Sequence, residues 1–341
     1  MNATDVLYGG LDLHGDNVFC SLLNEARQVV FERRLPNDLA TIRDALEPFR
    51  KQIRALAVES TYNWYWLVDG LRKLQYDTRL ANPAQMQENI GLKAANDKTD
   101  ARFLARQLIS GSLPEGYIYP METRGVRDLL RRRMRLTNIR TGEWLSLEGL
   151  VARHTGQDLG IQELRKANIE ELLAGHPEAI LMAQASLRHI AFVDLEIKEL
   201  EKSVMAVLPD EMAYQRLMTV PGIGPVLART ILLETGPIER FSHAGNYASY
   251  CRAVRSEHTS NNKKKGEGNG KCGNKYLAWA YVEAANFAVR YSPELRAWFQ
   301  RKQKRSGKRV VAIKALSCKL TKACFFILRD STEFEVKKLT H

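Results

Sequence analysis

Apolar and polar residues follow two different periods in the N-terminal part of the chain. Short runs with period two predict strands, and segments with apolar residues three or four positions apart predict helices. In chain order they predict a hairpin, a helix, a strand, a helix, a strand and a further helix at residues 6–35, 39–53, 54–60, 63–74, 77–83 and 96–108. Such alternation is typical of a mixed sheet flanked by helices. We therefore predict an α/β domain at residues 1–118.

Residues 119–208 have a helical pattern, and its second half repeats every seven residues. Two adjacent series make up this repeat: Ala183, Ile190, Ile197 and Val204, and Ser186, Val193, Leu200 and Val207. A heptad stripe of this kind predicts a coiled-coil connector whose seam is buried against another helix. That helix is either the preceding segment of the same chain, residues 126–154, or part of a second subunit.

Residues 209–341 predict a mainly helical C-terminal domain that opens with a glycine-containing turn. Gly222 and Gly224 precede a helical segment within residues 219–236. Backbone N–H groups at the start of a helix are open to an anion, as in the helical hairpins that grip a DNA phosphate. We predict phosphate binding here, with a plain turn between two helices as the alternative.

Positive charge is concentrated in this C-terminal part. The chain has 51 Lys and Arg against 39 Asp and Glu, a net charge of +12. Residues 252–329 contain 19 basic and 4 acidic residues, a net charge of +15 that leaves −3 for the rest of the chain. A charge so concentrated is typical of nucleic-acid binding.

Other features argue against a membrane protein or a zinc ribbon. The apolar stretch at residues 278–289 is too short to span a bilayer and is interrupted by Glu283. The N-terminus lacks the basic start and apolar core of a signal peptide. The 5 cysteines form no Cys-x-x-Cys pair, which favours reduced thiols in a cytoplasm.

A second group of basic residues lies on the helical segment before the heptads. It consists of Arg124, Arg127, Arg131, Arg132, Arg133 and Arg135. Such a run is usually the solvated face of a helix. Because these arginines cover much of the segment, we predict that Arg124, Arg127 and Arg131 contact phosphate.

The first candidate functional residues are the carboxylates Asp12, Glu59, Asp97 and Asp100. Asp12 and Glu59 lie in predicted strands, and Asp97 and Asp100 lie three residues apart at the start of a predicted helix. Side chains three apart on a helix share one face. Carboxylate oxygens are the ligands that Mg²⁺ prefers, and two such ions can clamp a phosphodiester. We predict a metal site, with four ordinary surface acids as the alternative.

A polar, glycine-rich and cationic loop is the second candidate. It contains the hydroxyl residues Ser256, Thr259 and Ser260. Its lysines, with one at the start of the following helix, are Lys263, Lys264, Lys265, Lys271 and Lys275, which we predict to bind nucleic acid. From its chemistry alone, a serine here is a phosphate-binding hydroxyl, a solvated loop residue or a nucleophile whose target phosphate is neutralised by the lysines.

The motifs GLDLHGD, AVES, NDKTDA, TVPGIGP, SEHTSNN and KCGNKYL occur in this order along the chain. The ordered set resembles the DEDD-type insertion-sequence transposases, a family that includes the invertases of pilin genes. The resemblance extends from about residue 7 to about residue 330. It implies an RNase H-like (RuvC-like) N-terminal domain and a C-terminal domain that carries a reactive serine.

The resemblance also implies site residues. Divalent metal, Mg²⁺ or Mn²⁺, would be held by Asp12, Glu59, Asp97 and Asp100. Ser260 best matches the nucleophilic serine, which forms a covalent phosphoserine intermediate with DNA. The family's glycine after the serine is missing and its preceding proline is replaced by Val254, so Ser256 remains the alternative.

The implied partners are double-stranded DNA, a structured noncoding guide RNA and further copies of the chain, in a dimer or a tetramer. The implied location is the bacterial cytoplasm, with the nucleoid. Two other functions would explain part of the same sequence features. A RuvC-like junction nuclease would need the acids with water as the nucleophile, and a noncatalytic nucleic-acid-binding protein would need the charge alone.

Overall fold

The structure of the protein is a computed structural model that describes residues 6–86, 97–207, 210–254, 257–260, 263–267 and 272–340. At residues 257–260, at residues 263–267 and at Thr340, it describes the backbone only and not the side chains. The chain forms two compact units: the residues up to Met121 together with Cys272, and the rest of the chain.

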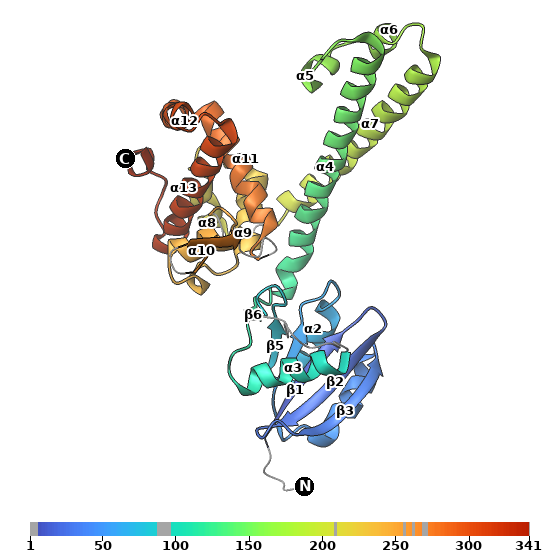
Figure 1. The fold of residues 1–341 in the computed structure, drawn as a ribbon, viewed down its shortest axis with the longest axis vertical. Coiled ribbons are helices and arrows are strands. Elements are labelled where there is room, and N and C mark those ends of the chain that lie inside the picture. The colour runs from blue at the N-terminus through green and yellow to red at the C-terminus, as the bar shows by residue number, and fades with distance from the viewer. Residues whose placement is uncertain are drawn as a thin grey trace. The chain divides into compact units, whose positions relative to one another are not determined.

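A six-stranded mixed sheet forms the centre of the first unit, in the order β3-β2-β1-β4-β5-β6 (Figure 1). β1, β2 and β3 are antiparallel neighbours, β4 and β5 continue parallel to β1, and β6 is antiparallel to β5. The strands are β1 (Leu7–Leu13), β2 (Asn17–Asn24), β3 (Val29–Pro36), β4 (Ile53–Glu59), β5 (Thr78–Ala81) and β6 (Glu115–Gly116). The helices are α1 (Leu39–Leu46), the 3₁₀ turn η1 (Glu47–Phe49), α2 (Tyr65–Lys73) and α3 (Asp97–Ile109). The predicted α/β organisation is confirmed.

The two faces of the sheet carry side chains of different size. On β4, Leu56 and Val58 belong to the core that α1 and α2 cover, whereas Ala55 and Ala57 belong to a smaller cluster with α3. Successive side chains of a strand point to opposite faces, so this division follows from the sequence of β4. The small alanines let α3 lie close to the sheet.

The closest approach of α3 is at Gly10 on β1. A Cβ atom added at Gly10 would lie 1.9 Å from the backbone carbonyl oxygen of Ala101 and 2.9 Å from the backbone nitrogen of Ala105. Only a residue without a side chain fits at this distance. Gly10 therefore lets α3, at Ala101 and Ala105, pack directly against the middle of β1.

Gly10→Ala should destabilise the first unit by about 1–3 kcal/mol, because α3 must shift to admit the methyl group. Urea unfolding measures this change. Gly142→Ala is the matched control, because a Cβ at Gly142 meets nothing within 4 Å, and there alanine should stabilise the helix by about 0.5–1 kcal/mol. Equal stability of Gly10→Ala and the wild type would contradict the close approach.

The second unit begins with a long antiparallel helix hairpin, α4 (Met121–Thr155) and α7 (Pro177–Met205), with the short helices α5 (Ile161–Leu164) and α6 (Ile169–Leu172) between them (Figure 1). Val193 and Ile197 on α7 pack with Leu136 on α4. The heptad seam is thus buried against the preceding helix of the same chain. Val207, predicted in the seam, lies beyond the end of α7 and is exposed.

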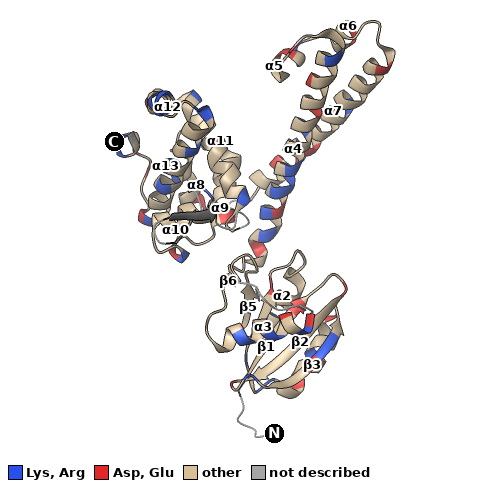
Figure 2. Ribbon diagram, in the orientation of Figure 1, with Lys and Arg blue, Asp and Glu red and all other residues tan. Residues whose placement is uncertain are grey.

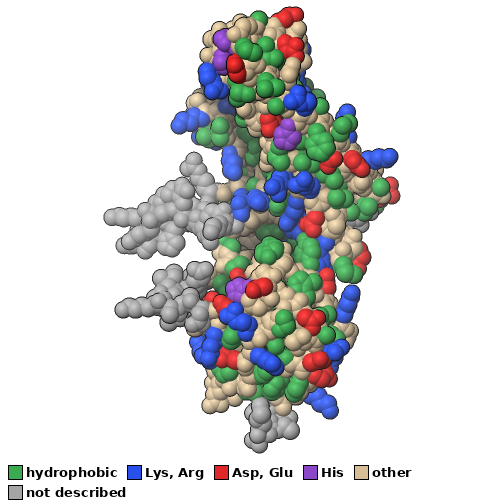
Figure 3. All heavy atoms as spheres, turned by 90° about the vertical axis from the view of Figure 1, so that its right-hand side faces the viewer, with side chains coloured by type: hydrophobic (Ala, Val, Ile, Leu, Met, Phe, Trp, Pro, Cys, Tyr) green, Lys and Arg blue, Asp and Glu red, His purple; other side chains and the backbone are tan. Residues whose placement is uncertain are grey.

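The outer side of α7 is less apolar than its seam, although Phe192 and Leu195 are exposed there. Figure 3 shows apolar side chains interspersed with charged ones on the face that it draws.

The rest of the second unit is mainly helical, as predicted, around a core that includes Tyr247, Tyr281, Leu316 and Phe325. Its elements are α8 (Glu211–Met218), α9 (Pro225–Thr235), η2 (Ile238–Arg240), α10 (Ala244–Tyr250), β7 (Glu257–Ser260), β8 (Lys263–Glu267), α11 (Lys275–Tyr291), α12 (Pro293–Ser306), α13 (Arg309–Asp330) and α14 (Val336–Thr340). Over the described ranges, no helix combines the length and the apolar character needed to cross a membrane.

Candidate functional site

The four predicted carboxylates converge at one edge of the sheet in the first unit. Asp12 lies near the end of β1 and Glu59 is the last residue of β4, and these two strands are parallel neighbours. Parallel strands bring their carboxyl ends to the same edge, where open α/β sheets place their sites. Asp97 and Asp100 lie in the first turn of α3, and the close packing of Ala101 on Gly10 places this turn beside β1.

The acids influence one another's protonation. Burial is the main reason that the pKa of Asp12, only 3% exposed, lies above its usual range. Burial, a hydrogen bond with Asp12 and the charges of Asp12 and Asp100 raise the pKa of Glu59 to about 7. Like charges confined in this way are relieved by a proton or by a cation. A set of crowded carboxylate oxygens therefore fits a hard divalent cation such as Mg²⁺.

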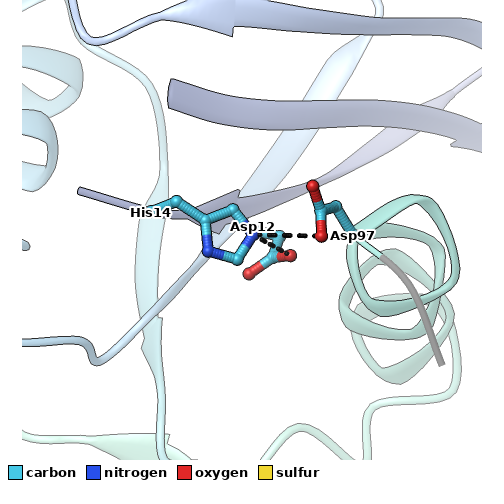
Figure 4. Close-up of side chains that lie close together, drawn as sticks. All are labelled: Asp12, His14 and Asp97. Carbon is cyan, nitrogen blue, oxygen red and sulfur yellow. Dashed lines mark ion pairs between the residues drawn. The ribbon is translucent and has the colours of Figure 1, made fainter. Parts of the chain in front are cut away.

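Two further residues, neither of them among the predicted site residues, join this cluster. The Nε2 atom of His14 lies 3.1 Å from Oδ2 of Asp12 and 3.3 Å from Oδ1 of Asp97 (Figure 4). Arg34 on β3 pairs with Oδ2 of Asp97 at 2.5 Å. A signal for His14 was available, because residues two apart in an extended segment face the same side and Asp12 is two positions away. Arg34 offered no such signal, since it meets α3 only in the folded chain.

Metal affinity should rise with pH up to about 7. Below this pH Glu59 carries a proton, and an incoming cation must displace it. Binding of Mg²⁺ at pH 6 should release about one proton, and at pH 8 almost none. Calorimetric titration in buffers of different ionisation enthalpy measures the number released. Glu59→Gln, which has no such proton, is the control, and equal release at both pH values would contradict the prediction.

The same raised pKa has a defined effect on the metal-free protein. Between the ordinary carboxyl value of 4.5 and about 7, folded Glu59 holds a proton that the unfolded chain has released. The free energy of unfolding therefore falls as pH rises through this window. A bound cation removes the repulsion between the carboxylates, so the decrease should be smaller in its presence.

Part of the arginine group on α4 is buried rather than exposed. Glu234 on α9 is 1% exposed, and its carboxylate accepts hydrogen bonds from Nε of Arg127 at 3.1 Å, from Nη2 of Arg131 at 2.9 Å and from Nδ2 of Asn274 at 2.7 Å. Burial alone would raise the pKa of Glu234, but these bonds and the arginine charges hold it below its usual range. Arg124 is also buried.

Phosphate contact by Arg124, Arg127 and Arg131 stays a prediction, although Arg127 and Arg131 are already paired with Glu234 in the folded chain. A buried carboxylate is tolerated only when it is paired, and Arg127 and Arg131 supply that pairing. Arg132 and Arg135, farther along α4, are exposed and remain open to a phosphate. Figure 2 shows basic residues along the first half of α4, but their burial differs from one to the next.

The two glycines of the turn before α9 lie in different surroundings. Gly222 has φ of +91°, and a Cβ there would lie 2.2 Å from the carbonyl oxygen of Ala284 on α11. Gly222 is thus required by backbone conformation and by packing, as the plain-turn alternative expects. Gly224 precedes the first residue of α9 and has open space around it, and anion binding at Gly222 and Gly224 stays a prediction.

The predicted serine loop contains a two-stranded hairpin. Ser260 is the last residue of β7 and pairs with Lys263, the first residue of β8. Ser256 and Lys271 lie outside the described residues, as do the side chains of Ser260, Lys263, Lys264 and Lys265. Lys275 is exposed at the start of α11.

The two ends of this loop are joined at its base. The backbone N–H of Asn274 donates to the carbonyl of Tyr250 at 2.6 Å, and Arg252 donates to the carbonyl of Gly273 at 3.0 Å. The Asn274 side chain begins α11 by accepting from the N–H groups of Tyr276 and Leu277. Because Asn274 also donates to Glu234, the buried charge cluster fixes the position of the loop's C-terminal end.

Comparisons with known proteins match both parts of the chain. Residues 9–154, which include all four carboxylates, match the DEDD-type IS110 transposase family, described as a transposase. Residues 214–300, which include Ser260 and Glu234, match the family described as Transposase IS116/IS110/IS902.

Individual relatives agree with these matches. A probable family 20 transposase of Pseudomonas aeruginosa is 24% identical to this chain, over 95% of the chain and 93% of the relative. The transposase for insertion sequence element IS1111A of Coxiella burnetii is 24% identical over 67% of the chain and 63% of its own length. The transposase for IS1328 of Yersinia enterocolitica is 25% identical over 43% of the chain and 45% of its own length.

Proposed function

Because the chain belongs to the family of DEDD-type insertion-sequence transposases, we propose that it cuts and rejoins DNA through a phosphoserine intermediate, with help from divalent metal. The observation that carries the proposal is the convergence of Asp12, Glu59, Asp97 and Asp100 at one sheet edge. The strand order of the sheet, with α3 against β1, supports an RNase H-like (RuvC-like) fold for the first domain.

In the proposed reaction, Ser260 and the metal have separate roles. The Ser260 hydroxyl attacks phosphorus, an Oγ–P bond forms, and the bond from phosphorus to a sugar oxygen breaks. The serine proton passes to a base, and the leaving sugar oxygen takes a proton from an acid and departs as a hydroxyl group. The Oγ–P ester keeps the bond energy for rejoining. Mg²⁺ or Mn²⁺ held by the four carboxylates would orient the phosphate and neutralise developing charge.

We propose that the enzyme binds both its DNA substrates and a guide RNA. We assign duplex DNA to the basic C-terminal domain, with Lys263, Lys264, Lys265, Lys271 and Lys275 as phosphate contacts. The family resemblance supports a guide RNA that pairs with donor and target DNA. It also supports a dimer or a tetramer, in which the carboxylates and Ser260 meet within a subunit or across an interface. Such an enzyme would work in the bacterial cytoplasm, at the nucleoid.

A strand-exchange assay tests the proposed function. Purified protein is mixed with donor and target plasmids that carry the element ends, with RNA transcribed from the adjacent noncoding DNA and with Mg²⁺. Joined donor–target molecules are expected. Cleaved but unjoined DNA would instead favour the water-using junction nuclease, and binding without any cleavage would favour a noncatalytic binding protein.

Nucleic-acid affinity should depend steeply on salt through the serine-loop lysines. Each phosphate contact on duplex DNA adds about −0.9 to the slope of log affinity against log salt. Replacing Lys263, Lys264 and Lys265 together by glutamine should therefore flatten the slope by about 0.9 for each lysine in contact. Fluorescence anisotropy at several salt concentrations measures it.

The matched control replaces the exposed lysines Lys166, Lys198 and Lys202 of the helix hairpin by glutamine. It changes the net charge equally and should leave the slope nearly unaltered. If the loop variant keeps the wild-type slope, the phosphate contacts lie elsewhere, on Arg132 and Arg135 or on the basic run at residues 301–309.

A further inference from the structure

We infer that His14 is a further ligand of the metal ion at this site, where its imidazole nitrogen joins the carboxylate oxygens and lies nearest to Asp12 and Asp97. The inference rests on the proposed function, because it concerns the ion that this chemistry uses. It adds a nitrogen donor to the carboxylates, and it predicts a preference for Mn²⁺ over Mg²⁺.

The three donor atoms have the spacing of neighbours around one ion. Nε2 of His14 is 3.1 Å from Oδ2 of Asp12 and 3.3 Å from Oδ1 of Asp97. All three atoms lie within 4.8 Å of one another. Two ligands at right angles around an ion with bonds of about 2.1 Å are about 3 Å apart. An ion can therefore enter this triangle with little movement of its ligands.

The backbone of His14 is held from several directions. Its N–H donates to the carbonyl of Asn17 at 2.8 Å. Its carbonyl accepts from Nδ2 of Asn37 at 3.1 Å and from Nδ2 of Asn63 at 2.9 Å. These partners come from three separate segments of the first unit. A residue fixed in this way loses little freedom when it binds a ligand, as a metal ligand should.

The two carboxylates are also fixed in orientation. Arg34 holds Oδ2 of Asp97, which leaves Oδ1 directed toward His14 (Figure 4). Asp12 is buried and cannot turn to solvent, whereas the His14 side chain is 42% exposed. Solvent therefore reaches this cluster on the side of His14.

The imidazole determines which ion is favoured. Mg²⁺ takes oxygen ligands and keeps several of its waters, so a nitrogen donor adds little to its binding. First-row transition ions accept imidazole more readily, and Mn²⁺ is the member of this series that also suits carboxylates. A site that adds one imidazole to its carboxylates should therefore bind Mn²⁺ more tightly than Mg²⁺.

Pulsed electron paramagnetic resonance of bound Mn²⁺ tests the inference in the full-length protein without any measurement of activity. A coordinating imidazole couples its ¹⁴N nucleus to the electron spin of Mn²⁺. The wild type should show this coupling and His14→Ala should not. Calorimetry should show Mn²⁺ binding at least about tenfold weaker in His14→Ala, with a smaller change for Mg²⁺.

His189→Ala is the matched control. Nδ1 of His189 lies 2.8 Å from Oε1 of Glu143 in the second unit, so it is another histidine paired with a carboxylate. This variant should keep both the coupling and the affinity.

Two results would overturn the inference in distinguishable ways. If Mn²⁺ binds without nitrogen coupling, and Asp12→Asn abolishes that binding, the carboxylate site of the proposed function stands but His14 is not a ligand. If Asp12→Asn leaves Mn²⁺ affinity unchanged, the carboxylate site itself is wrong, and the His14 assignment fails with it.

Discussion

Asp12→Asn should lower the rate of DNA strand cleavage by about a thousandfold or more, because the site loses a charge that holds the metal. The variant should remain folded. Asparagine has the same shape and can still hydrogen-bond to Glu59, and it removes one of the charges that raise the pKa of Glu59. The metal-free variant should therefore be at least as stable as the wild type. Cleavage of labelled DNA and urea unfolding measure the two effects.

Asp44→Asn is the control for this experiment. Asp44 lies on α1 in the same unit, is 68% exposed and pairs with its neighbour Arg43. It should change neither cleavage nor stability, since an exposed pair of this kind contributes little. Wild-type cleavage by Asp12→Asn would mean that the convergent acids do not form the active site.

Ser260→Ala should abolish the covalent protein–DNA adduct. A serine nucleophile leaves protein joined to DNA after denaturation, whereas water leaves no adduct. Removing Oγ removes the attacking atom, so adduct formation should fall below detection while metal and DNA binding persist. Denaturing gels of radiolabelled DNA detect the adduct. Ser260→Cys should keep slow cleavage, because a thiolate is also nucleophilic.

Ser256→Ala separates a wrong residue from a wrong mechanism. If Ser260→Ala still forms the adduct and Ser256→Ala does not, the nucleophile is Ser256 and the phosphoserine mechanism stands. If neither variant differs from the wild type, the serine mechanism itself fails and the nuclease with water gains support.

Much of the first unit was predictable from local patterns. Period-two runs located β1, β2, β3 and β4, and amphipathic segments located α1 and α2. The parallel pairing of β1 with β4 then brought Asp12 beside Glu59. Two antiparallel turns make β3 run in the direction of β1, and the crossover through α1 keeps that direction for β4. The two-residue strand β6 was not predicted, since so short an element has no period to detect.

The neighbours of a buried face were less predictable. The heptads of α7 required a partner helix, but the same stripe fits either another segment of the chain or a second subunit. The fold shows α4 of the same chain against Val193 and Ile197. The arginines of α4 resembled one another in sequence, yet Arg127 and Arg131 face the buried Glu234 and Arg132 faces solvent.

The sequence by itself determined the strand and helix periods, the order of the acids along the chain and the concentration of positive charge, because these depend on residues close together in the chain. Only the tertiary structure decided that Gly10 admits α3, that Glu234 pairs with arginines about 100 residues away and that His14 meets Asp97. A period shows which face of an element is apolar, but it does not show what covers that face. The metal ligands and the buried ion pairs depend on contacts between distant segments, which exist only once the sheet and helices have packed.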